Sequence, residues 1–345
     1  MDKLFDLIIK HRNLSPSTIK NYMRALNKLK LDVGGVGVAS FMYRWAEILK
    51  HIKDAPTKKP YKLNILNCYI VAIDAYIKEG RENSVEGLWE KTSGDIETGL
   101  AECRKLQGQL KEHLDIAKFS ETKTEKEDKN WVGFEELEKC VKSNLKSLNK
   151  ILKRTTNPDH KDIHKIHLWV ISALYASGKG NPPLRLDFNN MHIINQDDYD
   201  KLEDKKSKNY LVVQSQRTKY FVLNEYKTFK KYGSKSIKSS PPLNKVINKY
   251  LQIRKGLSPV KNDLLLFNNK NEPLSESLLS GYIGEAFMDT GKKINANLIR
   301  HIFITDIALH LPLAERNVIA SKMCHNLEQQ LIYNKTNASN SSDEE

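Results

Sequence analysis

The stretch that decides the fold is MHIINQDDYDKLEDKKSKNYLVVQSQRTKYFVLNEYKTFKKYGSKSIKSS, residues 191–240. Within it, short runs rich in β-branched and aromatic residues alternate with polar turn residues, a pattern typical of β-strands. These runs are MHIINQ (191–196), NYLVVQ (209–214), KYFVLNEYK (219–227) and SKSIKSS (234–240). They predict one small antiparallel sheet.

On both sides of this stretch the apolar residues recur at helical spacing instead. The clearest helix begins in NLSPSTIKNYMRALNKLKL (13–31), where Ser15 suits the N-cap and Pro16 the first helical position. Further helical patterns occupy residues 41–53, 61–80, 93–117, 131–141, 243–255, 275–289 and 296–311. The fold class is therefore mainly α, with the small sheet inside an α+β domain.

The segment SETKTEKEDKN (120–130) contains no aliphatic residue that could join a core, and a chain of 345 residues is long enough for two domains. We expect a helical domain over residues 1–120, a linker over 121–128 and a second domain over 129–335. The polar end TNASNSSDEE (336–345) is expected to be disordered.

The chain is strongly basic, with a formal net charge of +14. Such a charge favours a polyanionic partner, of which nucleic acid is the commonest. The four cysteines are scattered without a CxxC pair, which argues against a structural zinc site and for a reducing compartment. No apolar run has the length of a membrane span, so we expect an intracellular protein.

Several familiar sites are missing from the sequence. There is no GxxxxGK[ST] or GxGxxG loop for a nucleotide and no GxSxG elbow for a hydrolase. The histidines of HKDIHKIH (160–167) lack the glutamate that a zincin requires after its first histidine. We expect neither a cofactor nor a metal.

Four separated pieces of sequence carry residues suited to phosphate chemistry. Arg185 lies in NPPLRLDFNNM (181–191), and Lys227 lies in NEYKTFKKYG (224–233), where a strand ends. NLIRHIF (297–303) carries Asn297 and Arg300, and MCHNLEQQLIY (323–333) carries His325 and Tyr333. Each piece alone is a weak signal.

In this order, behind a basic helical domain, the four pieces resemble the tyrosine recombinases of the phage-integrase type. That family uses Arg, Lys, His-x-x-Arg, His or Trp, and Tyr in this sequence. The resemblance implies a helical core-binding domain followed by a catalytic domain. It also implies that Tyr333 is the nucleophile and that Arg185, Lys227, Asn297, Arg300 and His325 complete the catalytic set.

Two of the quoted pieces are more specific. PPLRLDFNNM and NEYKTFKKYG are similar to integrases of eukaryotic large DNA viruses, virophages and related mobile elements. This similarity implies DNA integration in a host nucleus or viral factory, or in the cytoplasm if the host is prokaryotic.

The chemistry of these residue types agrees with the resemblance. Attack on a phosphodiester increases the charge on the non-bridging oxygens, which the planar guanidiniums of Arg185 and Arg300 can bind bidentately. Because a free tyrosine has a pKa of about 10, Tyr333 needs a cationic surrounding. His325 can exchange a proton near neutral pH, and Lys227 on a hairpin can protonate the leaving 5′-oxygen.

Double-stranded DNA is the expected partner, and exposed basic side chains should contact its phosphates. The candidates are Lys20, Arg24, Lys230, Lys231 and Lys235. Since each chain offers one Tyr333 and an exchange between two duplexes needs four cuts, we expect a homotetramer on paired DNA sites.

Three departures from the family pattern leave other functions open. Asn297 stands where the family usually has His or Lys, Met323 and Cys324 stand where Leu-Gly is usual, and the interval from His325 to Tyr333 is one residue short. A type IB topoisomerase, or a DNA-binding protein with a decayed site, therefore remains an alternative.

Overall fold

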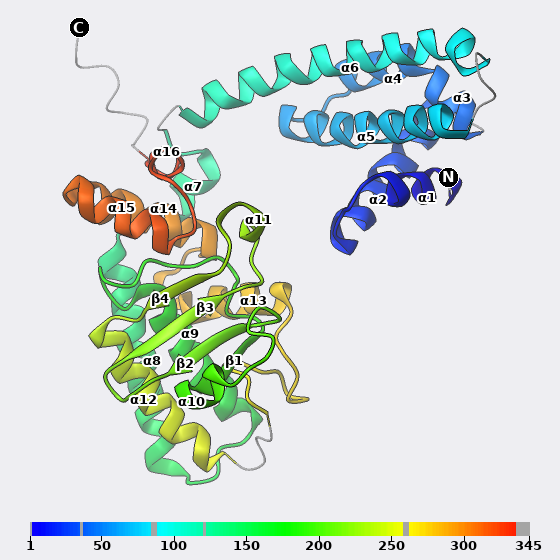
Figure 1. Ribbon diagram of the computed structural model, residues 1–345. Helices are drawn as coiled ribbons and strands as arrows, with labels where there is room; N and C mark the ends of the chain where they lie inside the picture. Colours follow the sequence, from blue (N-terminus) through cyan, green and yellow to red (C-terminus); the bar gives the residue numbers. More distant parts are fainter. Residues whose placement is uncertain (1, 35–36, 84–87, 120–121, 258–261, 336–345) are drawn as a thin grey trace, which may run out of the picture. The chain divides into compact units, whose positions relative to one another are not determined.

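The computed structural model describes residues 2–34, 37–83, 88–119, 122–257 and 262–335 (Figure 1). The chain forms two compact units, Met1–Ser120 and Glu121–Glu345. No helix in the described ranges has both the length and the apolar character needed to cross a membrane.

Unit 1 is helical throughout its described residues. Its central helix is α5, which carries buried residues such as Tyr69 and Ile73, and the Tyr69 hydroxyl lies within hydrogen-bond distance of the Phe41 carbonyl at 3.2 Å. Gly99 of α6 lies so close to Trp45 that a Cβ there would approach the indole to 2.4 Å, so this helix crossing requires glycine. The helices are α1 (Asp2–His11), α2 (Pro16–Val33), α3 (Val38–Tyr43), α4 (Trp45–Asp54), α5 (Lys59–Asn83) and α6 (Leu88–Phe119).

The start of α2 confirms the capping pattern seen in the sequence. The Ser15 hydroxyl accepts a hydrogen bond from the Thr18 amide at 3.3 Å, and Pro16 is the first helical residue. The helix ends at Gly34, whose φ of 68° is the left-handed conformation that glycine adopts most easily.

Unit 2 surrounds a four-stranded sheet with helices. The strands, in spatial order, are β1 (Met191–Asn195), β2 (Asn209–Val213), β3 (Lys219–Leu223) and β4 (Lys235–Lys238). Its helices are α7 (Glu125–Asn130), α8 (Phe134–Arg154), α9 (His160–Ala176), α10 (Gln196–Asp200), α11 (Phe229–Tyr232), α12 (Pro241–Gly256), α13 (Glu276–Ala286), α14 (Ala296–Asp306), α15 (Leu313–Lys322) and α16 (Leu327–Ile332), with the 3₁₀ turns η1 (Met288–Thr290) and η2 (Ala308–His310).

The two faces of the sheet have different partners, because successive side chains of a strand point to opposite faces. Leu211 and Phe221 belong to the main core, together with Trp169 of α9 and Tyr250 of α12. Tyr210, Val212 and Val222 alternate with them and form a smaller cluster with residues near α10.

The fold class predicted from the sequence, mainly α with a small sheet, is confirmed, but the sheet is mixed. β2, β3 and β4 pair antiparallel, whereas β1 pairs parallel with β2. Because parallel strands run in the same direction, the chain must return to the end of the sheet where the first strand began. The segment that contains α10, between β1 and β2, provides this return.

The segment expected to be a linker, residues 121–128, differs from the expectation. Helix α7 begins inside it at Glu125, because Thr124 and Glu127 form a reciprocal capping box. The lack of aliphatic residues in this segment predicts a linker, but the capping box stabilises a short helix there. The tail expected over 336–345 lies outside the described residues.

Candidate active site

Tyr333 lies at the C-terminal end of α16 and is only 8% exposed. Its ring is in contact with three basic side chains. The guanidinium carbon of Arg300 is 5.2 Å from the ring centroid, and the rings of His301 and His325 lie at 4.7 and 5.6 Å. The His325 ring is nearly parallel to the phenol, at 17°.

Arg300 lies on α14 and is almost fully buried. It donates hydrogen bonds to the Pro183 carbonyl at 2.7 Å and to the Met323 carbonyl at 3.3 Å. The guanidinium therefore joins the loop that carries Arg185 to the segment that carries His325. Its Nε is buried without a hydrogen-bond partner.

Arg185 is half-buried in the loop before β1. Its backbone is fixed on both sides, because its carbonyl accepts a hydrogen bond from the Tyr175 hydroxyl and its amide donates to Asp187 at 3.1 Å. Burial raises the pKa of the Asp187 carboxyl, while Arg300 and Arg185 act in the opposite direction.

The two arginines change the acidity of the phenol. Burial alone would raise the pKa of Tyr333, but the positive charges of Arg300 and Arg185 outweigh it, so that the net pKa lies below the usual value. A tyrosine whose phenolate is stabilised in this way is a better nucleophile than a free one.

His325 is placed to accept a proton. Its Nδ1 lies 3.0 Å from the Asn326 carbonyl, which can only accept, so Nδ1 carries the hydrogen and Nε2 has the lone pair. This Nε2 is buried and has no partner. Burial lowers the pKa of the imidazole to about 4, so the ring is neutral at pH 7.

An open groove of about 460 Å³ lies beside this histidine. Tyr232 and Lys235 of the hairpin that β3 and β4 form (residues 219–238) line one part of it, and Cys324 and Asn326 line another. The Thr228 hydroxyl donates to the Cys324 carbonyl at 3.3 Å, which attaches the hairpin to the His325 segment. The groove therefore provides room for a ligand between the hairpin and His325.

Cys324 adopts a φ of 57°, in the left-handed region where an L side chain is strained. Glycine, which has no Cβ, would adopt this conformation without strain at the position before His325. We expect Cys324→Gly to be more stable than Cys324→Ala by about 1 kcal/mol, because both lose the thiol but only alanine keeps the strained Cβ. Urea unfolding of the two variants measures the difference, and equal midpoints would show that the left-handed conformation is not retained in solution.

The structure does not bring Lys227 and Asn297 into contact with the other four candidates. Lys227 is exposed in the turn after β3, one residue before Thr228. Asn297 is exposed in the first turn of α14 and lines a separate cavity with Glu127 and Lys293. The three-residue spacing from Arg300 does not bring it to the same site, because Arg300 points into the core.

The candidate DNA-binding residues are accessible. Lys20 and Arg24 are exposed on α2 of unit 1, and Lys230 and Lys231 are exposed on α11 of unit 2. Lys235 is half-buried, and its ammonium lies 5.7 Å from the centroid of Tyr232, with that of Lys231 at 5.1 Å.

Two residues of the site, Asp187 and His301, are not among the candidates that the sequence indicates. Asp187 lies in the same quoted piece as Arg185, so a carboxylate two residues after a candidate arginine was the available signal. His301 donates from Nδ1 to the Tyr333 carbonyl at 3.0 Å, and no local sequence pattern reveals a contact across 32 residues.

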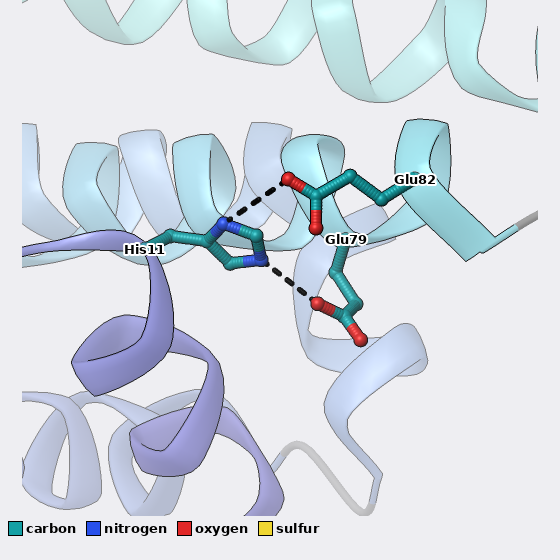
Figure 2. A group of neighbouring side chains, drawn as sticks. All are labelled: His11, Glu79 and Glu82. Atoms are coloured by element: carbon teal, nitrogen blue, oxygen red, sulfur yellow. Dashed lines mark hydrogen bonds and ion pairs between the residues drawn. The ribbon is translucent and has the colours of Figure 1, made fainter.

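Among the described residues, one group of His, Cys, Asp or Glu side chains is close enough to share a cation: His11, Glu79 and Glu82 in unit 1 (Figure 2). Each ring nitrogen faces a different carboxylate, with Nε2 at 2.8 Å from Glu79 and Nδ1 at 3.7 Å from Glu82. The Lys10 ammonium already lies 2.6 Å from Glu79. We interpret the group as an ion-pair cluster that joins α1 to α5.

No protein-family model matches the chain, and no curated protein matches it by sequence. Among solved structures, the chain is similar to the one described as "Crystal structure of XerA recombinase". The two share 12% identity with a TM-score of 0.40, over 98% of this chain and 95% of the other. At this level of similarity, the function rests on the geometry of the site itself.

Proposed function

We propose that the chain is a tyrosine recombinase that cuts and rejoins DNA through a 3′-phosphotyrosine intermediate. One observation carries the proposal: the buried Tyr333 phenol lies beside Arg300 and Arg185 and is stacked on a neutral His325. A purely structural tyrosine needs neither two guanidiniums nor a histidine with a free acceptor nitrogen.

In the proposed cleavage step, the Tyr333 oxygen attacks the scissile phosphorus and the bond to the 5′-oxygen breaks. The phenol proton passes to His325 Nε2. Arg185 and Arg300 bind the non-bridging oxygens as their charge increases, and each such donor typically contributes about 3–4 kcal/mol. Lys227, on the hairpin attached through Thr228, protonates the leaving 5′-oxygen. Asn297 is assigned a secondary role in binding the phosphate.

Rejoining is the reverse of this step. A 5′-hydroxyl, whose proton returns to Lys227, attacks the phosphotyrosine. The bond from phosphorus to the Tyr333 oxygen breaks, and that oxygen recovers the proton from His325. Because the phosphotyrosine conserves the energy of the phosphodiester, the reaction requires no ATP and no metal. With one Tyr333 per chain, exchange between two duplexes requires a homotetramer.

The proposed biological role is supported only by the resemblance of residues 182–191 and 224–233 to integrases of viruses and mobile elements. We propose integration of such an element. A type IB topoisomerase would use the same residues but act as a monomer on one duplex. Relaxation of supercoiled plasmid without recombinant product on paired sites would favour that function.

DNA binding should depend strongly on salt, because it relies on phosphate contacts. We expect Lys231→Ala to weaken binding to all sequences alike and to reduce the slope of log affinity against log salt by about 1. Lys270→Ala is the matched control, since Lys270 is an exposed lysine on the turn between α12 and α13. A wild-type affinity that is flat between low and moderate salt would contradict the proposed interface.

The catalytic proposal is tested with a nicked DNA duplex from which the short cleaved strand diffuses away, so that the covalent complex accumulates. A denaturing gel with labelled DNA then separates the adduct from free DNA. We expect a shifted band without added metal or nucleotide. A chain that binds DNA but gives no band would instead be the DNA-binding protein with a decayed site.

A further inference from the structure

The nucleophile is held at its backbone as well as at its ring. His301 follows Arg300 on α14, so that two consecutive residues contact the same tyrosine. Arg300 lies over the phenol ring, whereas His301 Nδ1 donates to the Tyr333 carbonyl at 3.0 Å. That carbonyl can only accept, so the hydrogen is on Nδ1, and Nε2 of the neutral ring carries the lone pair.

The residue on the other side of His301 is Glu127 of α7. Its Oε1 lies 3.7 Å from His301 Nε2. Its Oε2 accepts hydrogen bonds from the Thr124 amide and hydroxyl, each at 2.9 Å, and the Glu127 amide donates to the Thr124 hydroxyl. The capping box therefore fixes the carboxylate in the orientation that faces the imidazole.

The chain that follows Tyr333 is attached to the same region. The Lys335 amide donates to the Thr305 hydroxyl of α14 at 3.1 Å, and the Lys335 ammonium donates to the Thr122 carbonyl at 3.4 Å. Lys335 is only 9% exposed. The start of unit 2 is thus connected to the nucleophile in two ways. Glu127 faces His301, which binds the Tyr333 carbonyl, and Thr122 binds Lys335, two residues after Tyr333.

We propose that Glu127 and His301 are positioning residues for Tyr333: they hold its backbone carbonyl and so set the distance from the phenol to the scissile phosphate. The inference rests on the proposed function. Since α7 is the first helix after the boundary between the units, a shift of α7 would change the position of the nucleophile. Neither residue touches the reacting atoms.

The charges around His301 give this contact a pH dependence. Burial lowers the pKa of the imidazole; the Tyr333 carbonyl and Glu127 raise it, and Lys335 and Arg300 lower it further. The net pKa lies below 6.5, so the ring is neutral at pH 7. As the pH falls, protonation of Nε2 creates an ion pair with Glu127. The contribution of Glu127 should therefore increase toward acidic pH.

The test compares Glu127→Gln with Glu125→Gln, which removes the same charge from an exposed position in the first turn of the same helix. We expect Glu127→Gln to leave adduct formation near the wild-type rate at pH 7, where Nε2 has no hydrogen to donate, and to slow it about fivefold at pH 5.5 with unchanged DNA affinity. Glu125→Gln should behave as wild type. His301→Asn keeps a donor at the Nδ1 position but cannot reach Glu127, so adding Glu127→Gln to it should have no further effect.

A second measurement needs no catalysis. At pH 5.5, amide hydrogen exchange of the peptide covering 324–335 should be about fivefold faster in Glu127→Gln than in Glu125→Gln. Equal exchange in both variants, or equal adduct rates across the pH range, would overturn the positioning role. If wild-type protein forms no adduct but the exchange difference appears, the proposed function fails while the attachment of Tyr333 to α7 stands.

Discussion

Tyr333→Phe should form no covalent adduct with DNA and should bind DNA as tightly as the wild type. The substitution removes the attacking oxygen and leaves the ring contacts with His301 and His325 in place. Because the side chain is buried beside two guanidiniums, we expect a loss of stability of about 1 kcal/mol. A denaturing gel measures the adduct, and a filter-binding assay measures the affinity.

Tyr226→Phe and Tyr232→Phe are the matched controls, because both tyrosines lie on the hairpin near the groove. The Tyr226 hydroxyl donates to the Gly233 carbonyl at 2.7 Å, and burial raises its pKa to about 12. It is therefore a poor nucleophile, in contrast to Tyr333. If the adduct survives in Tyr333→Phe but disappears in either control, the nucleophile is a tyrosine of the hairpin.

Arg300→Ala and Arg185→Ala should each slow cleavage by about a hundredfold or more, following the loss of an oxyanion donor. Their effects on stability should differ. Loss of Arg300 leaves the Pro183 and Met323 carbonyls without their donor, which costs about 1–3 kcal/mol each when such groups stay buried. Arg185 is half-buried, so its replacement should change stability much less.

The comparison of the two variants separates the effect on the cleavage rate from the effect on stability. Urea unfolding gives the stability of each variant, and single-turnover adduct formation below the unfolding transition gives the rate per folded molecule. If Arg185→Ala is folded and cleaves at the wild-type rate, the guanidinium pair does not bind the scissile phosphate. Arg300→Lys should recover part of the stability but little of the rate, because an ammonium cannot bind two oxygens in one plane.

The sequence predicted the elements of the fold where local chemistry decides them. Ser15 and Pro16 start α2 as expected, and the alternating runs in residues 191–240 form strands. The predicted antiparallel pairing of β1 was wrong, because β1 pairs parallel with β2. The direction of pairing depends on the path of the chain through α10 and not on the residues of the strand itself. In residues 121–128 the capping box of α7 was overlooked among the charged residues.

The residues of the candidate site could likewise be predicted only in part. Arg185, Arg300, His325 and Tyr333 come from separate parts of the chain and lie together around one phenol. Lys227 and Asn297 are exposed, and their roles stay predictions. The contact from Glu127 through His301 to Tyr333 depends on three-dimensional packing, which one sequence does not encode in any local pattern.

The most direct test of the account is to identify the amino acid that carries the DNA. The accumulated covalent complex is digested with nuclease and protease, and the modified peptide is identified by mass spectrometry. We predict a nucleotide attached through its 3′-phosphate to Tyr333, in a peptide that contains residues 323–335. Attachment to Tyr226, Tyr232 or any other residue, or through a 5′-phosphate, would contradict it.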